Sequence, residues 1–177
     1  ERWGKLAGQV LVAGVMAYEG VVMLSVPFLG TSTVLPGPVL VAVTVFVVLA
    51  TTNAVNFIDG LDGLAAGIVA IASFAFFVYS YVLSPTYDPP NVFSTATFVT
   101  AATLGCCLGF LPHNVNPARL FMGESGALLL GLLLAAATIS LTGSVDPSSV
   151  SGDSLTAALL PILAPLAVLS LPFLDML

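Results

Sequence analysis

Charged residues are scarce in this sequence. Asp, Glu, Lys and Arg make up 7% of its 177 residues, whereas hydrophobic residues make up 58%. Soluble domains carry about 25% charged residues, so this chain lacks the material for a water-soluble surface. The three basic residues also exclude nucleic-acid binding, because neutralising a phosphate backbone takes several cations. The composition predicts an integral membrane protein.

Cysteine is nearly absent too. The two cysteines, Cys106 and Cys107, are neighbours inside an apolar run. Adjacent cysteines rarely form a disulfide, and a buried free thiol behaves as a small hydrophobic group. The sequence therefore offers no disulfide framework for the fold.

Long apolar runs are what the sequence has in quantity. Six of them approach the ~20 residues with which a helix crosses the hydrocarbon core of a bilayer. They cover residues 6–24, 39–55, 64–83, 93–111, 120–141 and 155–177. We therefore expect an all-α, polytopic transmembrane helix bundle that forms one domain over residues 1–177.

The basic residues fall on one side of the predicted membrane. If the loops alternate between the two sides, Arg2, Lys5 and Arg119 share a side with the loops 56–63 and 112–119. Lys and Arg mark the cytoplasmic side of membrane proteins. We therefore expect a multi-pass protein of the cell membrane whose polar loops face the cytoplasm.

A row of polar residues ends the second predicted span. They recur at every third position: Asn53, Asn56, Asp59 and Asp62. In an unbroken helix each such step drifts by about 60°, so the row would spread over half the circumference. Gly60 and Gly63 indicate that the helix breaks here and lets the polar groups converge. One Asp-Gly pair is an ordinary turn, but two pairs behind two asparagines at the membrane edge favour a binding site. Carboxylates and amide oxygens are the ligands that Mg²⁺ prefers, and Mg²⁺ in turn binds phosphates.

A second polar segment precedes the fifth predicted span. Asn116 and Pro117 are typical of a helix N-cap and first helical position, which would place Arg119 in the first turn, where it can contact a phosphate. Glu124 follows at membrane depth, where a carboxylate must be paired or bound to a metal. Pairing of Glu124 with Arg119 is the alternative to a metal site. His113 is interpreted either as a base or phosphate donor, or as a structural hydrogen-bonding residue.

Two stretches carry a specific resemblance. Residues 53–67 read NAVNFIDGLDGLAAG, and residues 109–126 read GFLPHNVNPARLFMGESG. Both resemble the polyprenyl-phosphate N-acetylhexosamine-1-phosphate transferases of glycosyltransferase family 4. The Phe-Ile at 57–58 and the Pro-Ala-Arg at 117–119 are more similar to the branch that uses UDP-N-acetylglucosamine than to the branch that uses UDP-muramoyl-pentapeptide.

The resemblance implies a Mg²⁺-dependent enzyme with its catalytic face in the cytoplasm. Such an enzyme transfers a sugar 1-phosphate from a UDP-sugar to a polyprenyl phosphate in the bilayer and releases UMP. Asp59 and Asp62 would bind or orient the diphosphate and the attacking lipid phosphate, and Glu124 would ligate Mg²⁺. Contacts to substrate, or support of the loops, would come from Asn53, Asn56, His113, Asn114 and Arg119. A homodimer is an open alternative to a monomer.

The chain departs from the family in two respects. Family members carry an Asp-Asp motif before the first span seen here and a His-rich loop after the last, so the chain resembles the middle of a longer enzyme, incomplete at both ends. Glu124 also stands where the family has a metal-binding Asp. Two other classes stay open: a transporter, which would place polar groups near mid-membrane, and an inactive structural membrane subunit, which the missing motifs favour.

Overall fold

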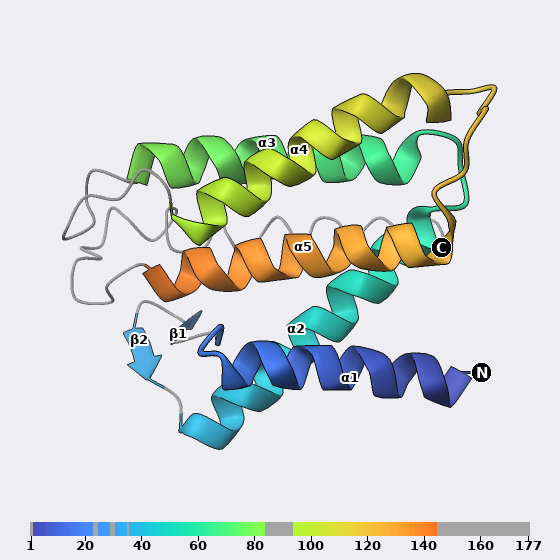
Figure 1. Cartoon of the computed structure of the whole chain (residues 1–177). Coiled ribbons are helices and arrows are strands. Elements are labelled where there is room, and N and C mark those ends of the chain that lie inside the picture. The colour runs from blue at the N-terminus through green and yellow to red at the C-terminus, as the bar shows by residue number, and fades with distance from the viewer. Residues whose placement is uncertain (1, 23–24, 29–30, 35, 84–93, 145–177) are drawn as a thin grey trace.

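The computed structural model describes residues 2–22, 25–28, 31–34, 36–83 and 94–144, and its helices form a bundle (Figure 1). The elements follow in the order α1 (Arg2–Tyr18), β1 (Ser25–Phe28), β2 (Thr31–Val34), α2 (Gly37–Ile58), α3 (Leu64–Leu83), α4 (Thr95–Asn114) and α5 (Gly123–Ser144). The predicted helical bundle is confirmed. The short antiparallel hairpin of β1 and β2, in which Ser25 lies opposite Val34, was not predicted. Its Val and Thr residues favour extended backbone.

Four of the six predicted spans are confirmed as helices long and apolar enough to cross a membrane. These are α2, α3, α4 and α5. The first predicted span extends too far, because α1 ends at Tyr18 and not at Leu24. Gly20, with a φ of 85°, lies in the turn that follows α1, and a left-handed glycine typically ends a helix. The sixth predicted span, residues 155–177, lies outside the described residues.

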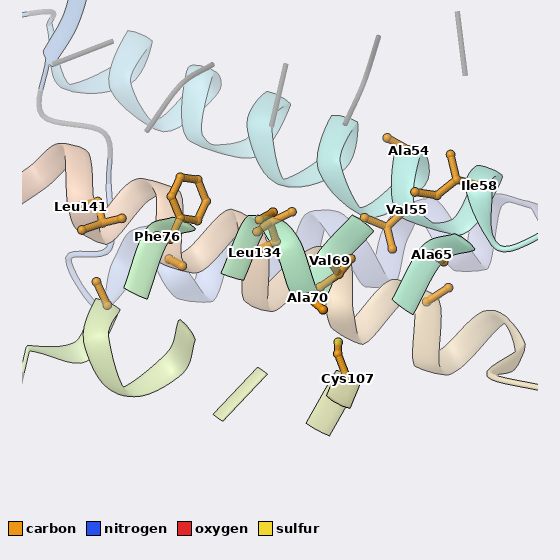
Figure 2. Packing of buried hydrophobic residues seen from close by; sticks show 14 residues of the cluster. Ala54, Val55, Ile58, Ala65, Val69, Ala70, Phe76, Cys107, Leu134 and Leu141 are labelled. Atoms are coloured by element: carbon orange, nitrogen blue, oxygen red, sulfur yellow. The ribbon is translucent and has the colours of Figure 1, made fainter. Parts of the chain in front are cut away.

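Small side chains make up the interior of the bundle. Buried residues of α2, α3, α4 and α5 meet in one cluster, and Ala is its commonest member (Figure 2). Large apolar side chains lie outside instead: Phe46, Ile71 and Phe98 are 69%, 72% and 71% exposed. Lipid tails solvate such side chains well, whereas close contact between membrane helices requires small residues. The arrangement is that of a protein whose outer surface is built for lipid.

The backbones of α2 and α5 meet at Gly131. A Cβ atom added there would lie 2.6 Å from the Cα of Thr52 and 3.0 Å from the carbonyl oxygen of Thr51. Thr52 precedes Asp59 by two helical turns, and Gly131 follows Glu124 by two turns. At 1.5 Å per residue, both carboxylates therefore stand about 10 Å along their helices from this contact. The contact places Asp59 and Glu124 at the same end of the bundle.

The two polar loops lie at this end as well. Figure 1 shows the start of α1, the α2–α3 turn and the α4–α5 loop together on the right, with the hairpin at the opposite end. Lys5 and Arg119 therefore share an end with both polar segments, as the alternation of spans predicts. The transporter alternative expected polar groups near mid-membrane, and these segments lie at one end instead.

Candidate active site

The α2–α3 turn is shaped by Gly63. α2 ends at Ile58 and α3 begins at Leu64, so the predicted break of the helix is confirmed. Gly63 has a φ of 76°, a conformation that L side chains rarely adopt, so the turn requires glycine at this position. Its N–H donates to Oδ1 of Asn114 at 3.0 Å. The turn is thereby fixed to the end of α4.

Asn114 holds the two loops together from inside. It is buried, with 5% of its surface exposed. Its Oδ1 accepts from the Gly63 N–H, and its Nδ2 donates to the carbonyl oxygen of Leu120 at 2.9 Å. The N–H groups of Arg119 and Leu120 both donate to the carbonyl oxygen of His113, at 2.8 and 3.0 Å. Both ends of the Asn114 amide are thus engaged within the protein, whereas the side chains of His113 and Arg119 are exposed.

Asp62 makes the second connection between the loops. Its Oδ2 accepts from Nδ2 of Asn116 and from the N–H of Ala118, both at 3.1 Å. Asp62 and Asn116 are exposed, so these bonds form at the surface of the site. A carboxylate that accepts hydrogen bonds from two N–H groups is held in a fixed orientation. Asp62 therefore orders the α4–α5 loop beside the α2–α3 turn.

The same contacts overturn the predicted helix start at Asn116. α5 begins only at Gly123, so Arg119 lies in an irregular loop and not in a first helical turn. An N-cap side chain would accept from a helical N–H, but the Asn116 side chain donates to Asp62 instead. The hydrogen bond to Asp62, a residue of the other loop, therefore replaces the local capping interaction.

Glu124 lies in the first turn of α5 and pairs with Lys5 of α1. Lys5 Nζ and Glu124 Oε1 are 2.6 Å apart, and the side chains are 30% and 62% exposed. The alternative that paired Glu124 with Arg119 is therefore wrong. Arg119 has no ion pair within the described part of the chain. Of the described cationic side chains at this end, Lys5 is paired and Arg119 is open to solvent.

Asn56 and Asp59 lie one turn apart at the end of α2. Burial raises the pKa of the Asp59 carboxyl above its ordinary value, because desolvation disfavours the charged form. Oδ1 of Asn56 is buried and accepts no hydrogen bond from the residues that the structure describes. An unsatisfied buried acceptor costs free energy, and such an atom in a native protein calls for a partner. Both groups are candidates for contact with a ligand.

A cavity of about 400 Å³ lies between α1, α2 and α5. Its polar lining comes from the loop end of the helices and consists of Lys5, Gln9, Thr52, Glu124 and Ser125. Its apolar lining lies one to two turns deeper and consists of Val12, Val48, Leu128, Leu129 and Leu132. One cavity thus offers a charged mouth and an apolar interior.

The side-chain oxygens at this end of the bundle are of the chemical type that a hard cation binds. The carboxylates of Asp59 and Glu124 and the orphaned oxygen of Asn56 belong to the class of ligands that Mg²⁺ takes. Among residues 2–22, 36–83 and 94–144, no three acidic, His or Cys side chains come together as a metal site. A cation held here would take its remaining ligands from substrate phosphates and water, as Mg²⁺ commonly does.

Lys5 and Gln9 were not singled out as site residues from the sequence. They lie one turn apart in α1, and residues at i and i+4 share one face of a helix. Two long polar side chains on one face of an otherwise apolar helix are the signal that identifies them. Gln9 donates from Nε2 to Oγ1 of Thr52 at 3.4 Å.

Comparison with known proteins adds an independent line of evidence. The sequence profile of glycosyl transferase family 4 matches residues 1–142. The chain is 38% identical over 185 residues to the decaprenyl-phosphate N-acetylglucosaminephosphotransferase of Mycobacterium leprae, a match that covers 100% of the chain and 46% of the relative. The Mycobacterium tuberculosis protein of the same name is 37% identical with the same coverage.

A relative with a different name matches less of the chain. The phospho-N-acetylmuramoyl-pentapeptide-transferase of Desulforudis audaxviator is 45% identical over 149 residues, which cover 76% of the chain and 42% of the relative. The chain spans less than half the length of each of these three relatives.

Proposed function

The chain belongs to glycosyl transferase family 4, and from this we propose that the whole protein transfers N-acetylglucosamine 1-phosphate from UDP-N-acetylglucosamine to a polyprenyl phosphate and releases UMP. This step would start the synthesis of a cell-envelope glycan. The relatives that match the full chain carry the name of an N-acetylglucosaminephosphotransferase. The phospho-N-acetylmuramoyl-pentapeptide-transferase matches 76% of the chain, and its name indicates the alternative donor, UDP-muramoyl-pentapeptide.

The cavity between α1, α2 and α5 is the observation that best supports this proposal. A polyprenyl phosphate has a phosphate head and a long apolar tail. The cavity pairs the Lys5 ammonium at its mouth with Val12, Val48 and Leu132 farther in. An apolar tail that enters from the lipid would stay in apolar surroundings against these side chains, so its entry requires no desolvation. The head group would then remain at the end of the bundle where the polar loops lie.

The reaction requires one bond to form and one to break. An oxygen of the polyprenyl phosphate attacks the phosphorus that carries the sugar, and a new diphosphate bond forms. The bond from this phosphorus to the bridging oxygen of the UDP breaks, and UMP leaves with that oxygen and the electron pair. The lipid phosphate is largely ionised at neutral pH, so the protein need not supply a strong base.

The residues of the site would divide this work. Asp59, half-buried and with a raised pKa, would share a proton with the lipid phosphate and so orient that phosphate for attack. Lys5 and the exposed Arg119 would neutralise the negative charge that the phosphates bring to the loops. Asp62 and Asn114 would act through position, because their hydrogen bonds hold the loops together.

Mg²⁺ is part of the proposal. Glu124 would hold the ion together with substrate phosphates, and the orphaned oxygen of Asn56 would support it directly or through water. When bound, Mg²⁺ would supply neutralisation of the diphosphate and stabilisation of the departing UMP. Glu124 reaches farther than Asp by one methylene, and its bond to Lys5 keeps that longer side chain at the mouth of the cavity.

The site would face the cytoplasm of a cell membrane, because the basic residues share its end of the bundle. Cysteine labelling of intact cells, in a background without native cysteines, tests this orientation. Glu19→Cys, which is exposed just beyond the far end of α1, should react with an impermeant reagent. Arg119→Cys should react only after the cells are opened, and its labelling in intact cells would contradict the orientation.

Transfer by the purified whole protein tests the reaction. Labelled UDP-N-acetylglucosamine and polyprenyl phosphate should give a labelled lipid and an equal amount of UMP, and removal of Mg²⁺ with a chelator should stop both. Labelled lipid with the muramoyl-pentapeptide donor alone would assign the protein to the other branch. A folded protein that forms neither product would contradict the proposed function.

A further inference from the structure

Gln9 joins α1 to two consecutive residues of α2. Its Nε2 donates to Oγ1 of Thr52 at 3.4 Å, and its Oε1 accepts from Nδ2 of Asn53 at 3.2 Å. The same Nδ2 also donates to the carbonyl oxygen of Leu49 at 2.7 Å. One side chain of α1 thus contacts a residue that lines the cavity and one that begins the polar row.

The direction of these hydrogen bonds is fixed by backbone carbonyls at both ends. The carbonyl oxygen of Leu49 can only accept, so the group of Asn53 that faces it is Nδ2. Oγ1 of Thr52 donates its single proton to the carbonyl oxygen of Val48 at 2.7 Å, so it must accept from Gln9. Gln9 therefore presents Nε2 to Thr52 and Oε1 to Asn53, and the opposite rotation of either amide would bring like groups together.

The consequence is that the oxygen of the Asn53 amide remains available to a ligand. Its Nδ2 is engaged twice, the residue is exposed, and Oδ1 is left free within the described ranges. The next polar residue of the row, Asn56, likewise has an amide oxygen without a partner there. The end of α2 therefore presents acceptors: two amide oxygens and, one turn on, the carboxylate of Asp59.

We propose that Gln9 is a positioning residue that, together with the Leu49 carbonyl, holds the Asn53 amide with Oδ1 toward the substrate. This inference rests on the proposed function. An amide oxygen repels phosphate oxygens, so Asn53 would take a hydrogen-bond donor of the nucleotide sugar, a hydroxyl or an amide N–H, or else the cation. Phosphates would be held instead by the cations Lys5 and Arg119.

A substitution of Asn53 that needs no positioning provides the test. Asp in place of Asn presents an oxygen in either rotation, so it should not depend on Gln9. In the whole protein, Gln9→Leu should lower kcat/KM about tenfold, as loss of one well-placed hydrogen bond commonly does. In the Asn53→Asp background the same substitution should cost less than about twofold. Thr100→Val, a buried threonine of α4 remote from this contact, is the matched control and should leave transfer unchanged.

Three outcomes would overturn the proposal. An equal loss from Gln9→Leu in both backgrounds would mean that Gln9 only holds α1 against α2. A folded Asn53→Asp protein without transfer would mean that the site needs the amide N–H. If Gln9→Leu fails to fold, Thr52→Val takes its place, because it removes the other partner of Gln9 at constant size, and an unchanged kcat/KM would then refute the idea.

The same measurements identify the group that binds Asn53. A rise in KM for the UDP-sugar at constant Mg²⁺ dependence would assign a donor of the substrate. A rise in the half-saturating Mg²⁺ concentration would assign the cation, and either result supports the positioning role. Failure of the proposed function is seen separately, as a lack of transfer by the unmodified protein. The hydrogen bonds are then still testable as non-additive changes in Tm between Gln9→Leu and Asn53→Leu.

Discussion

The two ends of the α3–α4 pair are both held by polar side chains, but in different ways. At the end away from the loops, Oγ of Ser80 lies 2.6 Å from Oγ1 of Thr97 and 3.2 Å from Oγ of Ser94, and Ser94 caps α4. These are neutral hydroxyls that satisfy one another inside the bundle. At the loop end, Asn114 and Asp62 connect the helices through an amide and a charge.

The two ends differ in whether polar groups are left without hydrogen-bond partners. The hydroxyl cluster uses its groups on itself, as buried polar groups in a stable structure generally do. The loop end, beside the same kind of contacts, keeps the free oxygen of Asn56 and the desolvated carboxyl of Asp59. We infer that the hydroxyl cluster is structural, and that the free oxygen of Asn56 beside the desolvated carboxyl of Asp59 marks the loop end as the candidate site.

Loss of the Glu124 charge is the strongest way to test that contrast. Glu124→Gln keeps the size of the side chain and an oxygen for Lys5, but removes the charge that a hard cation demands. Transfer should fall at least ~10²-fold, about 2.7 kcal/mol of transition-state stabilisation. Glu124→Asp should keep or raise activity. A Gln protein that turns over normally per folded molecule, with unchanged Mg²⁺ dependence, would remove Glu124 from the site.

Replacement of Asn114 tests the connection between the loops. Asn114→Leu leaves the Gly63 N–H and the Leu120 carbonyl without their partners, so the free energy of unfolding should fall by about 2 kcal/mol. The measurement is Tm in detergent, with Asn116→Ala as the control, since that exposed amide makes a single bond to Asp62. Equal shifts for the two variants would show that burial of Asn114 contributes nothing.

The raised pKa of Asp59 predicts opposite effects of pH on activity and stability. Burial favours the protonated carboxyl, so the part of the stability linked to Asp59 is fully present below pH 3.8 and is lost as pH rises through the folded pKa. Activity, which under the proposed mechanism needs the ionised form of Asp59, should instead fall as pH drops through the folded pKa. Asp59→Asn should lower transfer about tenfold or more and raise Tm at neutral pH. It should also remove the fall in activity on the acid side of the pH–activity profile, the acid limb. An unchanged acid limb would assign it to another group.

The smallest effect is expected at the hydroxyl cluster. Thr97→Val removes the bonds to Ser80 and Ser94 but keeps the shape of the side chain. Hydrogen bonds between membrane helices contribute about 0.6 kcal/mol on average, so Tm should fall slightly. Transfer per folded molecule should stay at the level of the unmodified protein. A loss of activity larger than the loss of stability would contradict the division between a structural end and a functional end.

Local rules explain what the sequence could predict. The apolar runs gave the positions of α2 to α5, and the Asp-Gly pairs gave the turn at residues 59–63, because each depends on neighbours along the chain. The site residues in that turn were visible for the same reason. Their roles stay predictions, since proximity alone does not show what a side chain binds.

Contacts between distant segments explain what the sequence missed. The capping pattern at Asn116 was a sound local signal, but Asp62, from another loop, takes the side chain. Lys5, not Arg119, pairs with Glu124, because α1 and α5 both begin at the loop end of the bundle and line the same cavity (Figure 1). α1 ends early at a left-handed glycine, which an apolar run does not reveal.

The close approach of α2 and α5 at Gly131 is the point about which the two helices would rotate relative to each other. Asp59 and Glu124 each lie about 10 Å along their helices from this contact. A rotation of about 5° between the helices would move one carboxylate by roughly 1 Å relative to the other, beyond the ~0.5 Å within which catalytic groups must be held. The absence of a single methyl group at Gly131, two turns away from the proposed site, therefore governs how Asp59 and Glu124 are spaced.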